Sequence, residues 1–182
     1  DSCYISRSAL IDDSLVVVYN DKTDYSSKIA VIDIASGSVK AKQDLDMNSY
    51  PLSMKKDSEG NLRIVMESWG MSGQKISVKT LDISTLEEKS AMDYSEILGL
   101  SDNESVSGVE FDESGNAYFM IVDYSGGMER NSEDGMPEIL NRGMKISPSG
   151  EVVYEMNDLG DLEGASTIYR KPDGTMFILS SN

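Results

Sequence analysis

The chain has 182 residues, an apolar share of 39%, and a net charge of −16 from 16 basic and 32 acidic side chains. This length is enough for one sizeable hydrophobic core or for part of a larger one. The acidic balance argues against nucleic acid and anionic membranes as partners, because both require clustered Lys or Arg. The single cysteine excludes an intramolecular disulfide, and the absence of histidine excludes His-dependent nucleophilic catalysis and argues against a zinc site.

The first part of the chain is predicted to form four short β-strands. Their ranges are residues 3–10, 15–19, 28–34 and 38–45, with turns at Asp12-Asp13-Ser14 and Ala35-Ser36-Gly37. The longest apolar run covers residues 15–19, far short of the roughly 18 residues that a membrane helix needs. We therefore expect no membrane insertion.

A second set of four strands follows with the same order of strands and turns. Its ranges are residues 51–55, 62–67, 75–83 and 88–92. The third strand of each set ends on a similar tripeptide, Ile32-Asp33-Ile34 in the first set and Leu81-Asp82-Ile83 in the second. This recurrence indicates an internal repeat.

A third set of strands covers residues 106–111, 117–122, 140–146 and 151–155, and a fourth set has only residues 165–170 and 176–179. Two segments stand outside the repeat. Residues 95–104 connect the second set to the third and are predicted to include one helical turn. Residues 125–138 interrupt the third set, and an insertion of this size in a compact repeat is often functional.

One turn recurs between the first two strands of the later sets. It reads Asp57-Ser58-Glu59-Gly60-Asn61, then Asp112-Glu113-Ser114-Gly115-Asn116, and in a shortened form Pro172-Asp173-Gly174-Thr175. Asp and Asn favour such turns through side chain to backbone hydrogen bonds, and Gly supplies a positive φ. The repeat predicts an all-β fold of β-propeller blades, each with four antiparallel strands.

The blades are predicted at residues 3–46, 50–94, 105–156 and 165–182, the last one incomplete. They form a single propeller-like domain over residues 1–182. About three and a half blades do not close a ring, so we expect the chain to be part of a larger propeller. The remaining blades would come from a longer chain or from another copy. The outer strands are polar and carry Lys, as expected of guarded sheet edges.

The segment Val109-Glu-Phe-Asp-Glu-Ser-Gly-Asn-Ala-Tyr-Phe119 resembles the blades of NHL-type, YVTN-type and related bacterial propellers. The strand-turn-strand segment Ile32-Asp-Ile-Ala-Ser-Gly-Ser-Val39 points the same way. The acidic composition, rich in Asp, Ser, Met and Tyr, is similar to propeller-like regions of exported Firmicutes lipoproteins, some of which precede a solute-binding domain. This resemblance implies an extracellular or cell-surface location.

The candidate ligand-binding residues lie where second strands run into loops and in the insertion: Trp69, Met71, Tyr124, Met128 and Arg130. Exposed aromatic side chains at such loops suit sugar stacking or a protein contact, and loop methionines give an adaptable surface. The alternative is that the aromatic side chains cap the blade core and that the methionines fill it.

The candidate metal ligands are Asp158, Asp161 and Glu163, which lie at short spacing near glycines, as calcium sites require. The segment does not match the EF-hand loop, so a plain interblade loop is the alternative. We expect no cofactor, with calcium as the one alternative, and no catalytic residue is assigned.

The sequence predicts a non-enzymatic, extracellular binding or scaffold module of propeller type, whose ligand is a protein, a peptide or a glycan. One alternative is a fragment of a propeller hydrolase or lyase that uses paired carboxylates, with or without calcium. The other is an accessory domain of a solute-binding lipoprotein. The acidic surface is explained by solubility, and a face that binds a cation or a cationic ligand is the alternative.

Overall fold

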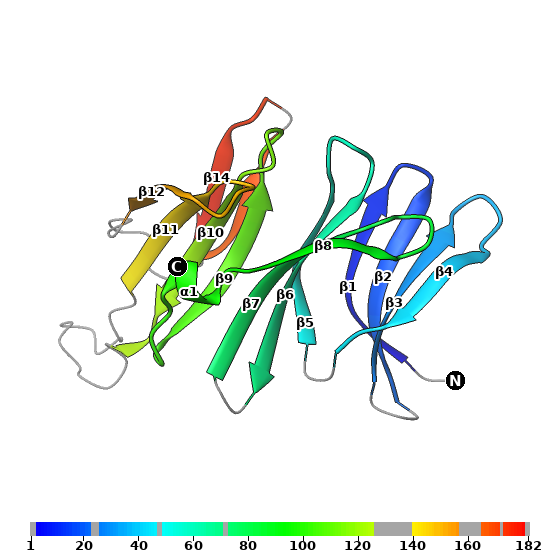
Figure 1. Cartoon of the computed structure of the whole chain (residues 1–182), viewed down its shortest axis with the longest axis horizontal. Helices are drawn as coiled ribbons and strands as arrows, with labels where there is room; N and C mark the ends of the chain where they lie inside the picture. The colour runs from blue at the N-terminus through cyan, green and yellow to red at the C-terminus, as the bar shows by residue number, and fades with distance from the viewer. Residues whose placement is uncertain are drawn as a thin grey trace. The chain divides into compact units, whose positions relative to one another are not determined.

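The fold was analysed in a computed structural model, which describes residues 3–22, 26–46, 49–70, 73–125, 140–156, 165–171 and 173–180. The strands form four antiparallel sheets (Figure 1). The first sheet contains β1 (Cys3–Ile11), β2 (Ser14–Asp21), β3 (Ser27–Asp33) and β4 (Val39–Asp44). The second contains β5 (Ser49–Lys56), β6 (Leu62–Gly70), β7 (Gly73–Leu81) and β8 (Glu88–Asp93).

The third sheet follows α1 (Ser95–Leu98) and contains β9 (Glu104–Phe111), β10 (Ala117–Asp123), β11 (Leu140–Ile146) and β12 (Val152–Met156). The fourth has two strands, β13 (Ala165–Arg170) and β14 (Met176–Ser180). Within each sheet every strand pairs with its neighbours in sequence. The predicted all-β fold of about three and a half propeller-type blades is confirmed, and so is the short helical turn between the second and third sets.

The chain divides into two compact units, Asp1–Ser95 and Glu96–Asn182. The first unit carries sheets β1–β4 and β5–β8, and the second carries sheets β9–β12 and β13–β14. The prediction that residues 1–182 form a single domain stays a prediction.

The recurring turn owes its shape to its aspartate. The Asp57 carboxylate accepts hydrogen bonds from the backbone N–H groups of Glu59 (2.9 Å) and Asn61 (2.8 Å), and Gly60 has a φ of 88°. Asp112 accepts the backbone N–H of Asn116 at 2.9 Å in the same way. The turn from Ser147 to Glu151 has equivalent backbone hydrogen bonds, with the Ser147 hydroxyl in place of the carboxylate.

The core of the first unit lies between its two sheets. Strands β2 and β3 contribute Val16, Val18, Ile29 and Val31, and the second sheet contributes Leu62, Ile64, Met66, Leu81 and Leu86. Period-two alternation places the strand residues of this set on the face between the sheets, while Val17, Ala30 and Val65 between them are buried on the opposite face. Leu86 is fully buried although its φ is 65°, a left-handed conformation that few non-glycine residues adopt. Core packing therefore holds this residue in a strained backbone.

In the second unit the two sheets approach closely at Gly108 of β9. A Cβ atom at this position would lie 3.0 Å from the backbone nitrogen of Ile168 in β13. Glycine therefore allows β13 to lie against β9.

The outer strands β4, β8 and β12 are largely exposed. This confirms the prediction of polar outer strands for β4 and β8, whereas β12 exposes Val152, Val153 and Tyr154. No helix among the described residues is long and apolar enough to cross a membrane.

Candidate ligand cavity on the second sheet

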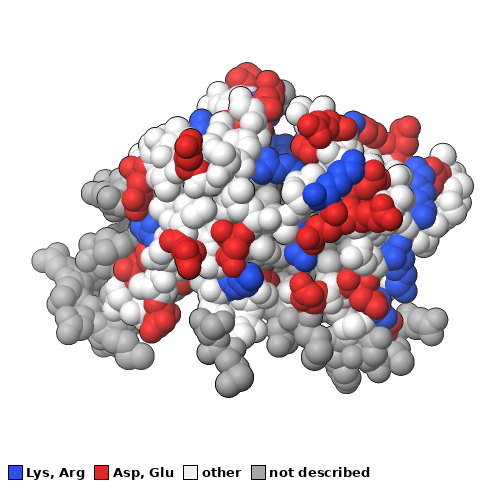
Figure 2. Space-filling view, in the orientation of Figure 1, with Lys and Arg blue, Asp and Glu red and all other residues white. Residues whose placement is uncertain are grey.

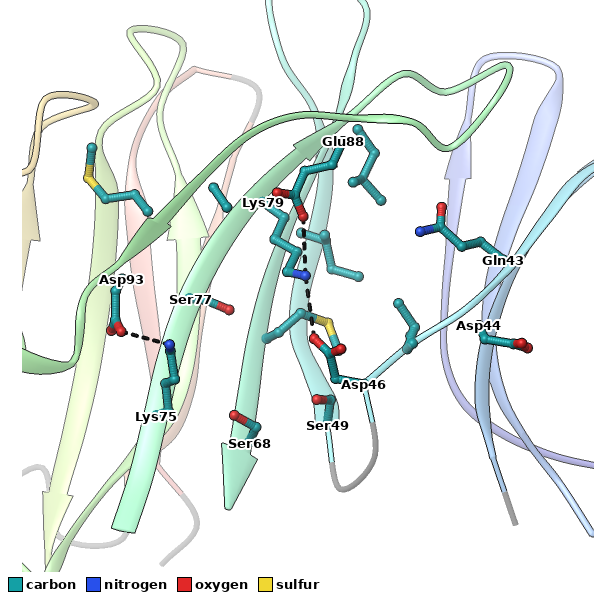
Figure 3. Close-up of a pocket in the computed structure, with 16 residues that line it drawn as sticks. Gln43, Asp44, Asp46, Ser49, Ser68, Lys75, Ser77, Lys79, Glu88 and Asp93 are labelled. Atoms are coloured by element: carbon teal, nitrogen blue, oxygen red, sulfur yellow. Dashed lines mark ion pairs between the residues drawn. The ribbon is translucent and has the colours of Figure 1, made fainter. Parts of the chain in front are cut away.

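A cavity of about 440 Å³ lies in the first unit, between the face of sheet β5–β8 and the end of β4 (Figure 3). Strands β6, β7 and β8 form its floor, and the end of β4 with the segment that follows forms one wall. The lining residues are Gln43, Asp44, Leu45, Asp46, Ser49, Ile64, Met66, Ser68, Lys75, Ser77, Lys79, Leu81, Glu88, Ala91, Met92 and Asp93.

Strand β7 places two lysines and a serine in this cavity. Lys75, Ser77 and Lys79 occupy alternate positions, while Ile76 and Val78 between them are buried. Because successive side chains of a strand point to opposite faces, the three polar residues share the cavity face. An inner strand of a blade thus carries charge on one face.

The floor beneath these polar groups is apolar. Ile64, Met66 and Leu81 belong to the core of the first unit, and Leu45 packs against that core from the β4 side. In the strand register Ile64 lies opposite Lys79, and Met66 lies opposite Ser77. The cavity therefore combines the edge of a hydrophobic core with polar groups one strand away.

Both lysines are paired with carboxylates. The Lys79 ammonium lies 3.5 Å from a carboxylate oxygen of Asp46 and 3.2 Å from one of Glu88, as the dashed lines in Figure 3 show. Lys75 lies 3.0 Å from Asp93. The Lys79 side chain is 26% exposed and that of Asp46 is 81% exposed, so the lysine is largely covered while its first partner lies in solvent.

The carboxylate of Asp93 stays ionised at neutral pH. The hydroxyl of Ser95, at 2.6 Å, is the largest contribution that lowers the pKa of Asp93, and the backbone N–H of Ser95 and the ammonium of Lys75 lower it further. A carboxyl group that serves as a general acid requires the opposite shift, towards neutral pH. Asp93 is therefore suited to holding Lys75 in place and not to donating a proton.

A row of hydrogen-bond donors crosses one end of the cavity. Ser49 of β5 lies opposite Ser68 of β6, and Ser68 lies opposite Lys75 of β7. Neighbouring strands are roughly 4.8 Å apart, so the backbone positions of the two serines and the lysine line up over about 10 Å, while the Lys75 ammonium itself lies at Asp93.

Two charged clusters in the second unit serve its fold. Arg142 of β11 donates to Glu104 at 2.6 Å, to Glu155 at 3.1 Å and to the carbonyl of Leu98 at 2.8 Å, and it thereby links β9, β12 and α1. Its guanidinium is the largest cause of the lowered pKa of Glu104.

The second cluster surrounds the turn aspartate of the third sheet. Asp112 accepts hydrogen bonds from the hydroxyl of Tyr118 (3.1 Å) and from the amide of Asn116 (2.8 Å), and it pairs with Lys145 at 3.3 Å. Lys145 also lies over the Tyr118 ring, 4.8 Å from its centroid. These contacts tie the turn to β11, which is a structural role.

The sequence-predicted ligand residues do not line the cavity where they are described. Trp69 is the next-to-last residue of β6 and is 51% exposed, and Tyr124 follows β10 and is 55% exposed. They belong to different units. Met71, Met128 and Arg130 lie outside the described residues, and so do the predicted metal ligands Asp158, Asp161 and Glu163. Within the described part of the chain no group of three or more metal-binding side chains comes together.

Sequence reasoning missed the cavity because its residues come from separate strands. One signal was available in the segment Lys75-Ile-Ser-Val-Lys79, where lysines alternate with β-branched residues in the third strand of a blade. Lysine is expected on outer strands, and here two lysines lie on one face of an inner strand.

No protein-family model matches the chain, and no curated protein matches its sequence. Solved structures do match its fold. A protein of unknown function from Bacteroides caccae is 9% identical over 98% of this chain and 53% of its own, with a TM-score of 0.56. A luciferin-regenerating enzyme is 12% identical over 93% of this chain and 49% of its own, with a TM-score of 0.54. The polysaccharide lyase Uly1 is 12% identical over 97% of this chain and 43% of its own, with a TM-score of 0.53.

These likenesses concern the fold alone, because identities this low carry no activity from one protein to another. The chain spans about half the length of the solved structures that it matches.

Proposed function

We propose that the chain is a non-enzymatic binding module of propeller type, presented by an exported bacterial protein outside the cell or at its surface. The cavity on the second sheet carries this proposal. Its volume of about 440 Å³ falls within the range of small-molecule and side-chain sites, which is roughly 300–1,000 Å³. The ligand is a peptide, a glycan or a segment of a partner protein.

The chemistry of the cavity supports binding over catalysis. Each of its lysines is neutralised by a carboxylate, and the pKa of Asp93 is lowered, so this carboxyl group offers no proton at neutral pH. The serines and Gln43 add neutral hydrogen-bonding groups. Ten of the sixteen lining residues are polar or charged, so the cavity offers a ligand mainly hydrogen-bonding groups.

The surface charge supports an exported, soluble module. Figure 2 shows acidic side chains spread over the visible face with lysine and arginine side chains among them. A net charge of −16 limits association with other acidic macromolecules and with anionic membranes. It does not hinder uncharged or mixed-charge ligands.

Methionine methyl NMR tests the proposal directly. Met66 and Met92 line the cavity, whereas Met120 is buried in the other unit and serves as a control. The probes are a panel of acetylated tripeptides and a panel of neutral and acidic monosaccharides. We expect at least one probe to shift the Met66 and Met92 signals and to leave that of Met120 in place.

Two variants locate the site. Ser77→Trp fills the cavity and is expected to abolish binding, while Ser90→Trp on β8, outside the lining, is expected to preserve it. Trp69→Ala tests the surface predicted from the sequence. Loss of binding in Trp69→Ala with retention in Ser77→Trp would place the site at Trp69 and refute the cavity. Turnover of a probe would favour the alternative of a carboxylate-based hydrolase or lyase.

A further inference from the structure

We propose that the cavity binds an uncharged sugar through hydrogen bonds to its serines and to its lysine–carboxylate pairs. This inference rests on the proposed binding function and specifies the class of ligand. Three features of the cavity carry it. Its serine hydroxyls have no partner among the described residues, the charges on its sheet face are balanced, and its apolar floor is almost fully covered.

Three serine hydroxyls on the cavity face are available to a ligand. Ser49, Ser68 and Ser77 line the cavity, and none of their hydroxyls makes a hydrogen bond to another described residue (Figure 3). Ser49 is only 5% exposed. Leaving a largely enclosed hydroxyl without a partner costs free energy, which a ligand hydroxyl beside it can recover. A serine hydroxyl can both donate and accept, as a sugar hydroxyl does.

The strand register spreads these hydroxyls over β5, β6 and β7 and sets an ion pair beside them. Ser49 lies opposite Ser68. Ser77 lies opposite Asp93, whose carboxylate is 3.0 Å from the Lys75 ammonium. The pair presents oxygen acceptors and N–H donors next to the serines. Two neighbouring sugar hydroxyls can donate to the carboxylate and accept from the ammonium, so they use the pair without breaking it.

The charges on the sheet face of the cavity are balanced. Besides the pair of Lys75, the sheet carries Lys79 and Glu88, which lie 3.2 Å apart. The two carboxylates in excess belong to Asp44 and Asp46, at the end of β4, and both residues are exposed. Exposed charges contribute little to binding. The cavity therefore offers no unpaired lysine to an anion and only a weak attraction to a cation.

The floor favours a sugar over a peptide. Ile64, Met66 and Leu81 are only 0–4% exposed, so they leave no room for an apolar side chain. Strands β6 and β7 are paired on both sides, so a peptide cannot add to them as a further strand. A sugar needs neither contact. No aromatic ring lines the cavity in the described residues, so a sugar is held without stacking and we expect weak binding of a single ring.

The test compares glucose, galactose and mannose, each with its uronate and its 2-amino sugar, so that one ring is presented with three charges. The Met66 and Met92 methyl signals are the readout. We expect at least one hexose to shift both signals, and its uronate to bind about two- to fivefold more weakly because its carboxylate finds no unpaired lysine. The amino sugar should bind within about fivefold of the hexose, since the excess carboxylates are exposed.

Salt gives an independent reading of the ligand charge. Raising NaCl from about 10 mM to about 1 M should change the affinity for the hexose by less than about twofold, because salt screens charges and the hexose has none. The affinity for a ligand that binds through its charge falls over this range.

Serine variants of the full chain locate the contacts. Ser49→Ala and Ser77→Ala each remove one hydroxyl and should weaken hexose binding by about two- to tenfold. Ser53→Ala is the matched control. Ser53 is another buried serine of β5, with 7% exposure, but it lies outside the cavity lining, so its replacement should leave binding unchanged. Circular dichroism checks that each variant folds, and Ser77→Ala carries the prediction alone if Ser49→Ala does not.

The outcomes separate this inference from the proposed function. Uronate binding as tight as that of the hexose, or unchanged hexose binding in the folded serine variants, overturns the sugar inference and leaves the binding function standing. So does an amino sugar that binds about tenfold more tightly and loses affinity in salt, which would identify a cationic ligand. Shifts caused by an acetylated tripeptide but by no hexose would overturn it in favour of a peptide. If no probe shifts Met66 or Met92 in the folded protein, both proposals are wrong.

Discussion

Replacing Arg142 by Met should destabilise the protein through the carboxylate that it leaves behind. Arg142 and Glu104 have side-chain exposures of 16% and 11%, and their shortest contact is 2.6 Å. Arg142 also donates hydrogen bonds to the Glu155 carboxylate and to the Leu98 carbonyl. Removing one partner of a buried pair costs about 3–5 kcal/mol. Glu104 keeps a hydrogen bond from the Ser101 N–H at 2.8 Å, so we expect a loss of about 2–3 kcal/mol.

Urea unfolding at pH 7, followed by circular dichroism, measures this loss. Lys56→Met is the control, because its pair with Asp12 is 41% and 65% exposed and should contribute about 0–1 kcal/mol. The double variant Arg142→Met/Glu104→Gln should recover part of the stability, since it no longer buries an unpaired charge. A loss for Arg142→Met as small as that of Lys56→Met would refute the reasoning.

The pH dependence of the same variant gives a second reading. The pKa of Glu104 in the folded protein is lowered from its ordinary value of 4.5, with the Arg142 hydrogen bond as the largest cause. Stability from this group is therefore fully present above about pH 4.5 and is lost as the pH falls through the lower folded pKa. Arg142→Met should lose less stability on acidification than the unchanged protein does.

Three further predictions concern the turns, the core and acid stability. Gly60→Ala should cost about 1–2 kcal/mol because its φ is 88°, even though the nearest atom to a new Cβ would be 3.8 Å away. The control Gly70→Ala adds a Cβ in open space and should be nearly neutral in the same urea titration. Ile29→Ala should cost about 2–5 kcal/mol because Ile29 is fully buried, and Ile34→Ala, with 51% exposure, should cost much less. The pKa of Asp82 is lowered, with the hydrogen bond from the Ser84 hydroxyl as the largest cause, so the ionised carboxylate adds stability that is lost on acidification. Asp82→Asn should therefore lose less stability between pH 5 and pH 3 than the unchanged protein. Equal loss in both proteins, measured by thermal unfolding, would contradict this assignment.

Local sequence signals predicted the strands well because turn chemistry is local. The Asp57 and Asp112 turns are determined by hydrogen bonds within five residues, so the sequence alone reveals them. Strand ends were less accurate: β6 runs to Gly70 and β7 starts at Gly73, so this hairpin is longer than predicted at its turn, whereas β7 ends at Leu81, two residues before the predicted end. Cross-strand pairing extends these strands, and no single residue signals it.

The candidate cavity was not predictable in the same way. Lys79 lies between Asp46, on the connection after β4, and Glu88, at the start of β8. Lys79 and Glu88 are brought together by the pairing of β7 with β8, whereas the approach of Asp46 depends on how the first sheet packs against the second. The sequence pointed instead to Trp69 and Tyr124, whose exposure fits a contact surface but whose role stays a prediction.

The uninterrupted strand order of each sheet has a consequence for how the chain folds. Each strand pairs only with its neighbours in sequence, so no sheet has to wait for a distant segment before its hydrogen bonds form. Short loops carry a small closure entropy, and folding rates rise as the average sequence separation of contacts falls. The first sheet needs only residues up to Asp44, and it can therefore assemble during synthesis before the strands of the second sheet have been made.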